Sequence, residues 1–194
     1  MTDEPSGGAG DEPPIVRLAG LFVRAETASP LPTRVSSALR RTAPERWSLR
    51  LAELMPVLIA AGLKVEGMDR DRTARWALLT HMVAVLAGTG GERSHAGGRP
   101  AGAALHDAGY SEARLAKLLS SRGDALRDQM ARLARYLRAA GAVPLDLRPL
   151  ADLVLFEGRD GARAEAARLR IARSYYAAAD RAARPTGETT TETA

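Results

Sequence analysis

Apolar residues recur at helical spacing along most of this chain. The clearest case is the stretch 69–87, where Trp76, Leu79, Val83 and Leu86 fall on one side of a helix. Only eight of the 194 residues are aromatic, so the core must consist mainly of Leu, Val and Ala. These residues suit helices, and no segment shows the alternation typical of strands. The sequence therefore predicts an all-α protein.

Turn-forming residues divide this pattern into nine expected helices. They cover residues 14–26, 32–42, 47–62, 69–87, 103–108, 111–121, 124–140, 146–156 and 160–184. Ser111 and Asp124 are placed to cap the helices that follow them. Pro56 should end or kink the third helix, because proline lacks the backbone N–H. In that helix four residues are expected to face inward, namely Leu51, Leu54, Leu58 and Ile59.

The run 88–102 is the clearest internal boundary in the sequence. It holds six glycines and one proline, and long loops in compact domains are usually functional or disordered. We therefore expect two small helical bundles, residues 13–95 and 96–185, joined by this glycine-rich loop. Residues 1–12 and 186–194 are expected to be disordered tails.

The cationic side chains are almost all arginine, which accounts for 26 of the 28. Residues 1–12 and 186–194 together carry six carboxylates and no cation. Removing those six negative charges from the net charge of +5 leaves +11 for residues 13–185. Arginine presents a planar fork of donors that suits phosphate. Such a balance predicts attraction to nucleic acid, an anionic membrane or an acidic protein.

Several classes of protein are excluded by what the sequence lacks. Without cysteine there can be no disulfide, thiolate zinc site or iron–sulfur cluster. The N-terminus does not resemble a secretory signal, and no run of 18 apolar residues is present, so we expect a cytoplasmic protein that does not span a membrane. The three histidines are far apart, and no metal, phosphate-loop or nucleophile motif appears. We predict no catalytic residue, no metal and no cofactor, and therefore no enzyme.

The expected helix 124–140 carries a cationic surface. Arg127, Arg135 and Arg138 fall within about 80° of one another at ~100° per residue. This surface could follow a phosphate backbone, or it could simply be a solvated helix face, and the sequence leaves both interpretations open. In the glycine-rich loop, His95 lies between Arg93 and Arg99 and is a further candidate for a phosphate contact.

A series of short motifs gives this chain a family resemblance. In order they are LRR at 39–41, ALLTHMV at 77–83, GAAL at 102–105, SEARLAKLL at 111–119 and QMARL at 129–133. This order resembles the CasB family, the small subunit of the type I-E CRISPR Cascade surveillance complex. The resemblance covers about residues 14–180.

The resemblance implies two helical bundles and a non-catalytic role, in which the subunit helps to hold the unwound target while the guide RNA pairs with it. It also implies two copies lying head to tail beside other Cascade subunits. Arg40 and Arg41 match the family's basic pair, and Arg114 matches its Ser-Glu-x-Arg element. Arg122, Arg132 and Arg135 correspond to basic positions of the second bundle. Where relatives often have an arginine after the glycine of GAAL, this chain has Ala103.

Our leading hypothesis is a Cascade small subunit that binds the backbone of the target and displaced DNA strands, and of the guide RNA. In such complexes base pairing reads the sequence while protein holds backbone and displaced strand. The candidate nucleic-acid contacts are Arg34, Arg40, Arg41, Arg93, Arg99, Arg114, Arg122, Arg127, Arg132, Arg135 and Arg138. Two alternatives are a helical transcription regulator that reads base edges, and a structural adaptor that binds an acidic protein.

Overall fold

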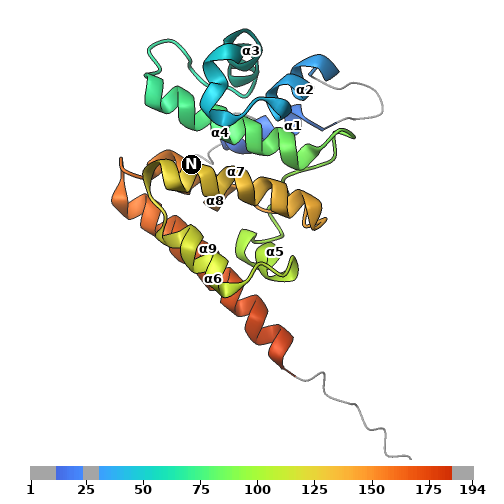
Figure 1. Cartoon of the computed structure of the whole chain (residues 1–194), viewed down its shortest axis with the longest axis vertical. Coiled ribbons are helices and arrows are strands. Elements are labelled where there is room, and N and C mark those ends of the chain that lie inside the picture. Colours follow the sequence, from blue (N-terminus) through green and yellow to red (C-terminus); the bar gives the residue numbers. More distant parts are fainter. Residues whose placement is uncertain (1–11, 24–30, 185–194) are drawn as a thin grey trace, which may run out of the picture.

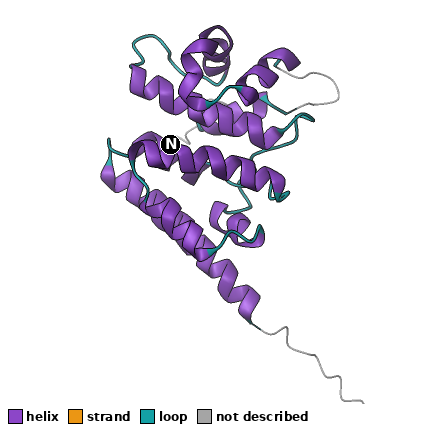
Figure 2. Cartoon of the chain, viewed as in Figure 1, coloured by secondary structure: helices purple, strands orange, loops and turns teal. Residues whose placement is uncertain are grey.

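The computed structural model describes residues 12–23 and 31–184. Within these ranges the chain forms helices and loops, and its single isolated bridge joins His95 to Leu145 (Figure 2). The predicted all-α class is therefore confirmed. The expected tails, except for Glu12, and the end of the first expected helix lie outside the described residues. No helix within the described ranges is both long and apolar enough to cross a membrane.

The helices lie close to their expected positions. They are α1 (Pro14–Leu21), α2 (Thr33–Arg41), the 3-10 helix η1 (Pro44–Arg50), α3 (Leu51–Ala60), α4 (Arg70–Ala87), α5 (Ala101–Asp107), α6 (Glu112–Ser120), α7 (Gly123–Ala139), α8 (Arg148–Phe156) and α9 (Gly161–Ala183). Ser111 caps α6 as predicted, since its side chain accepts a hydrogen bond from the backbone N–H of Arg114. Asp124 does not cap α7. It lies in the first turn, and the N-cap residue is Arg122.

The third expected helix differs most from its prediction. Its first part is the 3-10 helix η1, and α3 then continues past Pro56 to Ala60, so Pro56 does not end it. Leu54 and Leu58 are buried as predicted. Leu51 and Ile59 are 43% and 55% exposed, so their inward assignment was wrong. Ile59 lies about 100° around the helix from Leu58, and the neighbours that cover Leu54 do not reach the first residue of α3.

The helices are stacked in layers. Figure 1 shows α1 to α4 at one end of the molecule, α7 and α8 in the middle, and α5, α6 and α9 at the other end. Thirteen of the 18 residues of α4 are buried, because this helix packs against η1 and α2 on one side and α7 and α8 on the other. The buried apolar residues from Ile15 to Tyr175 form one cluster. The division into two bundles at residue 95 stays a prediction.

The glycine-rich loop is shorter than expected and is fixed at its end. The backbone N–H of Ala96 donates to Leu145 at 3.0 Å, and that of Asp146 donates to Arg99 at 2.7 Å. Gly102, expected in the loop, belongs to α5. A Cβ atom there would collide with the backbone oxygen of Ile171 in α9, so glycine permits the close packing of these two helices.

Two arginines, one half-buried and one buried, join helices through their guanidinium groups. Arg75 of α4 donates to the carbonyl oxygens of Val154 and Glu157, at 2.6 and 2.7 Å, at the C-terminal end of α8. Arg168 of α9 is 6% exposed; it donates to the carbonyl of Leu119 at 2.9 Å and pairs with the Glu157 carboxylate. These guanidinium groups satisfy backbone oxygens that helix ends leave without partners.

Candidate nucleic-acid interface

The arginines of α7 lie on two different sides of that helix. Its buried residues span an arc of about 160° at ~100° per residue, and they are Leu126, Met130, Ala131, Leu133, Ala134 and Leu137. By the same helical geometry, Arg127 and Arg138 project within this arc. Arg132 projects from the opposite side, Arg135 projects about 40° beyond the edge of the arc, and both are exposed. The cationic surface expected from the sequence is therefore divided. Arg127 and Arg138 lie beside the core, and Arg135 lies in the solvent.

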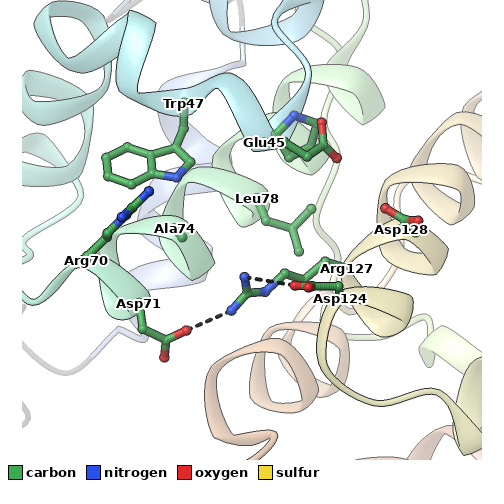
Figure 3. Close-up of a pocket in the computed structure, with 10 residues that line it drawn as sticks. Glu45, Trp47, Arg70, Asp71, Ala74, Leu78, Asp124, Arg127 and Asp128 are labelled. Carbon is green, nitrogen blue, oxygen red and sulfur yellow. Dashed lines mark hydrogen bonds and ion pairs between the residues drawn. The ribbon is translucent and has the colours of Figure 1, made fainter.

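Arg127 pairs with carboxylates at the N-terminal ends of α4 and α7. Its guanidinium lies 2.7 Å from Asp71 and 3.3 Å from Asp124 (Figure 3). Asp71 also pairs with Arg75 at 2.7 Å. Burial alone would raise the pKa of Asp71, but the surrounding guanidinium groups outweigh it and lower that pKa. Arg127 thus serves first to hold α7 against α4.

Arg138 performs the same function at the other end of these two parallel helices. It donates to the two carboxylate oxygens of Glu92 at 2.5 and 2.7 Å, and to the carbonyl of Leu86 at 3.3 Å. Its hydrogen bonds lower the pKa of Glu92, and Glu92 in turn raises the pKa of Arg138. Both groups therefore stay charged, and the α4–α7 pair is held at each end.

The exposed side of α7 continues onto α6. The Arg114 guanidinium of α6 lies 5.6 Å from the ring centroid of Tyr136, which is one helical turn from Arg132 on α7. Lys117 is one turn beyond Arg114 and is also exposed. Within the described residues, neither Lys117 nor Arg132 has an ion-pair partner. Lys117 was not among the candidates predicted from the sequence, although its spacing of three from Arg114 on a helix could have identified it.

His81 of α4 connects Arg135 of α7 with the C-terminal end of α2. His81 of α4 is buried, and its Nδ1 donates to the carbonyl of Leu39 at 3.2 Å. Burial lowers the pKa of His81, and the charge of Arg135 lowers it further. Arg135 is therefore close enough to act on His81, while Arg40 and Arg41 directly follow Leu39. Neither Arg40 nor Arg41 makes an ion pair in the described part of the chain.

These observations define a set of cations from three helices, which we call the arginine track. Its members are Arg40, Arg41, Arg114, Arg132 and Arg135. In Figure 1, α7 lies between the layer that holds α2 and the layer that holds α6, so the set spans the stacked layers. Arg34 lies two turns before Arg41 on α2 and is also exposed. The helices that carry the set are connected through packed pairs, since α2 packs on α4, α4 on α7 and α7 on α6.

The remaining candidates lie elsewhere. Arg93 is exposed and lines an open groove beside α1. Arg99 lies 3.5 Å from Asp107, and Arg122 donates to the carbonyl of Leu119 at 2.9 Å and lies 3.5 Å from Glu157. Both of these guanidinium groups therefore already have partners within the chain.

His95, the candidate phosphate contact of the loop, is half-buried. Its Nδ1 accepts a hydrogen bond from the backbone N–H of Leu147 at 3.2 Å. Burial lowers the pKa of His95, and the nearby Asp146 carboxylate, at 4.0 Å, opposes that effect. The side chain therefore holds the loop to the segment before α8. Among residues 12–23 and 31–184, no group of three or more His, Asp or Glu side chains is arranged to hold a metal ion.

Comparison with known proteins places this fold in a family. The family model described as CRISPR-associated protein Cse2 matches residues 35–176, which is well over half of the chain. Searches of curated proteins and of solved structures give no significant match. The matched region begins in α2 and ends in α9, so it includes all the helices that carry the arginine track. The chain therefore belongs to the CRISPR-associated Cse2 family, the small subunits of type I-E Cascade.

Proposed function

We propose that this Cascade subunit is non-catalytic and that it binds the sugar–phosphate backbone of nucleic acid through the arginine track. The observation that carries the proposal is the position of these cations. They lie on the outer sides of α2, α6 and α7, without carboxylate partners in the described part of the chain. Arg40 is partly buried, and the other four are exposed. Guanidinium groups that reach the solvent in this way can neutralise phosphates without reading bases. Arg34 and Arg93 are exposed in the same way and belong to the proposal as flanking contacts.

In the complex, this surface would hold the target and displaced DNA strands, and the guide RNA backbone, and so stabilise the R-loop. R-loop formation is a nearly balanced exchange of base pairs, so modest backbone contacts can favour it. Two copies of the chain would lie head to tail beside the other Cascade subunits. Arg99, Arg122, Arg127 and Arg138 would take part only if phosphate displaced their present partners.

The test is binding of fluorescently labelled DNA of mixed sequence at increasing salt. If Z phosphates are contacted, log K should fall by about 0.9Z per log unit of salt for duplex and ~0.7Z for single strands. The double variant R132E/R135E removes two charged contacts, each about 1.5 kcal/mol, and should weaken binding about a hundredfold. The control R181E/R184E makes the same charge change at the exposed end of α9 and should have a much smaller effect.

Other outcomes would favour the alternative functions. Salt-independent binding, or equal losses in the two double variants, would contradict the proposal. Enrichment of one palindrome from random duplexes would favour a transcription regulator. Unchanged DNA affinity after R40E/R41E would favour an adaptor for acidic protein, and metal-dependent cleavage of DNA or RNA would indicate an enzyme.

A further inference from the structure

A groove of about 580 Å³ lies between η1, α4 and α7, next to the arginine track. Its apolar lining comes from Pro44 and Trp47 of η1 and from Ala74 and Leu78 of α4. Trp47 is only half-buried and borders the open space (Figure 3). Apolar floors with a few charged groups at the rim are typical of binding sites.

The charges around this groove are mainly negative. Four carboxylates and two guanidinium groups line it, on a chain with a net charge of +5. Arg127 already pairs with two of those carboxylates, Asp71 and Asp124. Glu45 and Asp128 are exposed, and neither has an ion-pair partner within the described residues.

The two free carboxylates lie at one end of the groove. Figure 3 shows Glu45 from η1 and Asp128 from α7 at that end, with Leu78 on the floor of the groove beside them, while Trp47 and Arg70 occupy the other end. An arginine or lysine entering there would place its cation between two carboxylates and its aliphatic stem on Leu78. Its neighbours could pack on the indole of Trp47.

We propose that this groove binds a basic segment of another Cascade subunit, with an arginine or lysine held between Glu45 and Asp128. The inference rests on the proposed function only in that the partner belongs to the same complex. Charge complementarity favours protein over nucleic acid, because phosphates would meet four carboxylates here. η1 also exposes Leu49, at 71%, which suits an apolar protein contact.

The groove and the arginine track lie next to each other, so nucleic acid and the basic protein segment would bind at separate places. Asp128 lies one turn before Arg132 on α7, so the arginine track stops where the groove begins. Nucleic acid would follow the cations of α2, α6 and α7, and the basic protein segment would occupy the adjoining acidic end. The acidic groove would repel phosphates, and the arginine track would repel the basic protein segment.

The test uses the full chain and a Cascade complex reconstituted from its own subunits. The variant E45Q/D128N should bind the complex lacking the small subunit at least tenfold more weakly than wild type, which corresponds to about 1.4 kcal/mol. The control E66Q/D180N removes two exposed carboxylates outside the groove and should bind within twofold of wild type. For DNA, neither variant of the free chain should bind more weakly than wild type, because both changes remove negative charge. Carbodiimide cross-linking should join Glu45 or Asp128 to a lysine of another subunit, where the cation is lysine.

The results separate this inference from the proposed function. Wild-type assembly of E45Q/D128N, or an equal loss in the control, would overturn the groove as a docking site. A loss of DNA affinity specific to E45Q/D128N would assign the groove to nucleic acid and would also overturn it. If R132E/R135E binds DNA as wild type does, the proposed function fails, while the assembly result still decides the role of the groove.

Discussion

The two sides of α7 show how the same residue type can serve opposite purposes. Arg127 and Arg138 project into the buried arc and pair with Asp71 and Glu92. Arg132 projects away from the core, as does Arg135, and has no such partner in the described chain. The difference lies in the partners that distant segments bring to each side. An arginine-rich helix can therefore fasten a core with one face and present positive charge with the other.

The largest expected effect concerns the arginines that hold helices together. Arg168→Ala would remove a nearly buried cation from Glu157 and from the Leu119 carbonyl. Arg122 would still contact both groups, but the buried Arg168 side chain and its ion pair would be lost, so the free energy of unfolding should fall by about 2 kcal/mol. Urea denaturation measures this change.

A matched control for this prediction is Arg173→Ala, an exposed arginine of the same helix without an ion-pair partner in the described residues. It should change the unfolding free energy by at most about 0.5 kcal/mol. If Arg168→Ala were equally mild, the distinction between structural and surface arginines would not hold on α9.

Sequence alone predicted the helices far better than the partners of their side chains. Local periodicity was enough to locate α4 and α7, because their apolar residues repeat over several turns. The same rule put Ile59 in the core, although no neighbouring helix covers it there. Gly102 was expected in a loop. It is needed inside α5 instead, because the backbone of α9, about 70 residues later, leaves no room for a Cβ atom there. Contacts at such separations leave no local signal in the sequence.

The prediction of the candidate site also failed where contacts join residues far apart in the sequence. The spacing of Arg127, Arg135 and Arg138 correctly placed them within one wide sector of a helix. It could not show that Asp71 and Glu92, each more than 40 residues away, would lie against two of the three. Which arginines remain without partners is a property of the packed helices, and the family resemblance carried more of that information than spacing did.

An intermediate loss of stability is expected at the partly exposed ion pair between Arg127 and Asp71. Arg127→Gln removes one cation from Asp71, but Arg75 remains beside that carboxylate. Since the pair is partly exposed, the loss of stability should be at most about 1 kcal/mol. DNA affinity should change far less than in R132E/R135E, because Arg127 points toward α4. A large loss of DNA affinity with unchanged stability would show that Arg127 contacts phosphate after all.

The smallest expected effect is a change in the pKa of His81 when the charge of Arg135 is removed. Its charge adds to burial in lowering the pKa of His81, so Arg135→Gln should raise that pKa toward its ordinary value. In the folded wild type the pKa of His81 lies below the value of about 6.5 expected for an unfolded chain. The unfolded state therefore binds this proton more readily, and stability is lost as pH falls through that region.

Arg135→Gln should consequently lose less stability on acidification than wild type, whereas Arg127→Gln should follow the wild-type pH dependence of His81. NMR titration of the His81 ring protons distinguishes these cases, and His95, whose pKa is also lowered by burial, serves as an internal reference. Identical His81 titrations in all three proteins would mean that the charge of Arg135 is already compensated. A phosphate bound at Arg135 would screen the same charge, so saturating DNA should move the pKa of His81 upward as Arg135→Gln does. That agreement would place the nucleic acid on the solvent side of α7 by a measurement that does not depend on affinity.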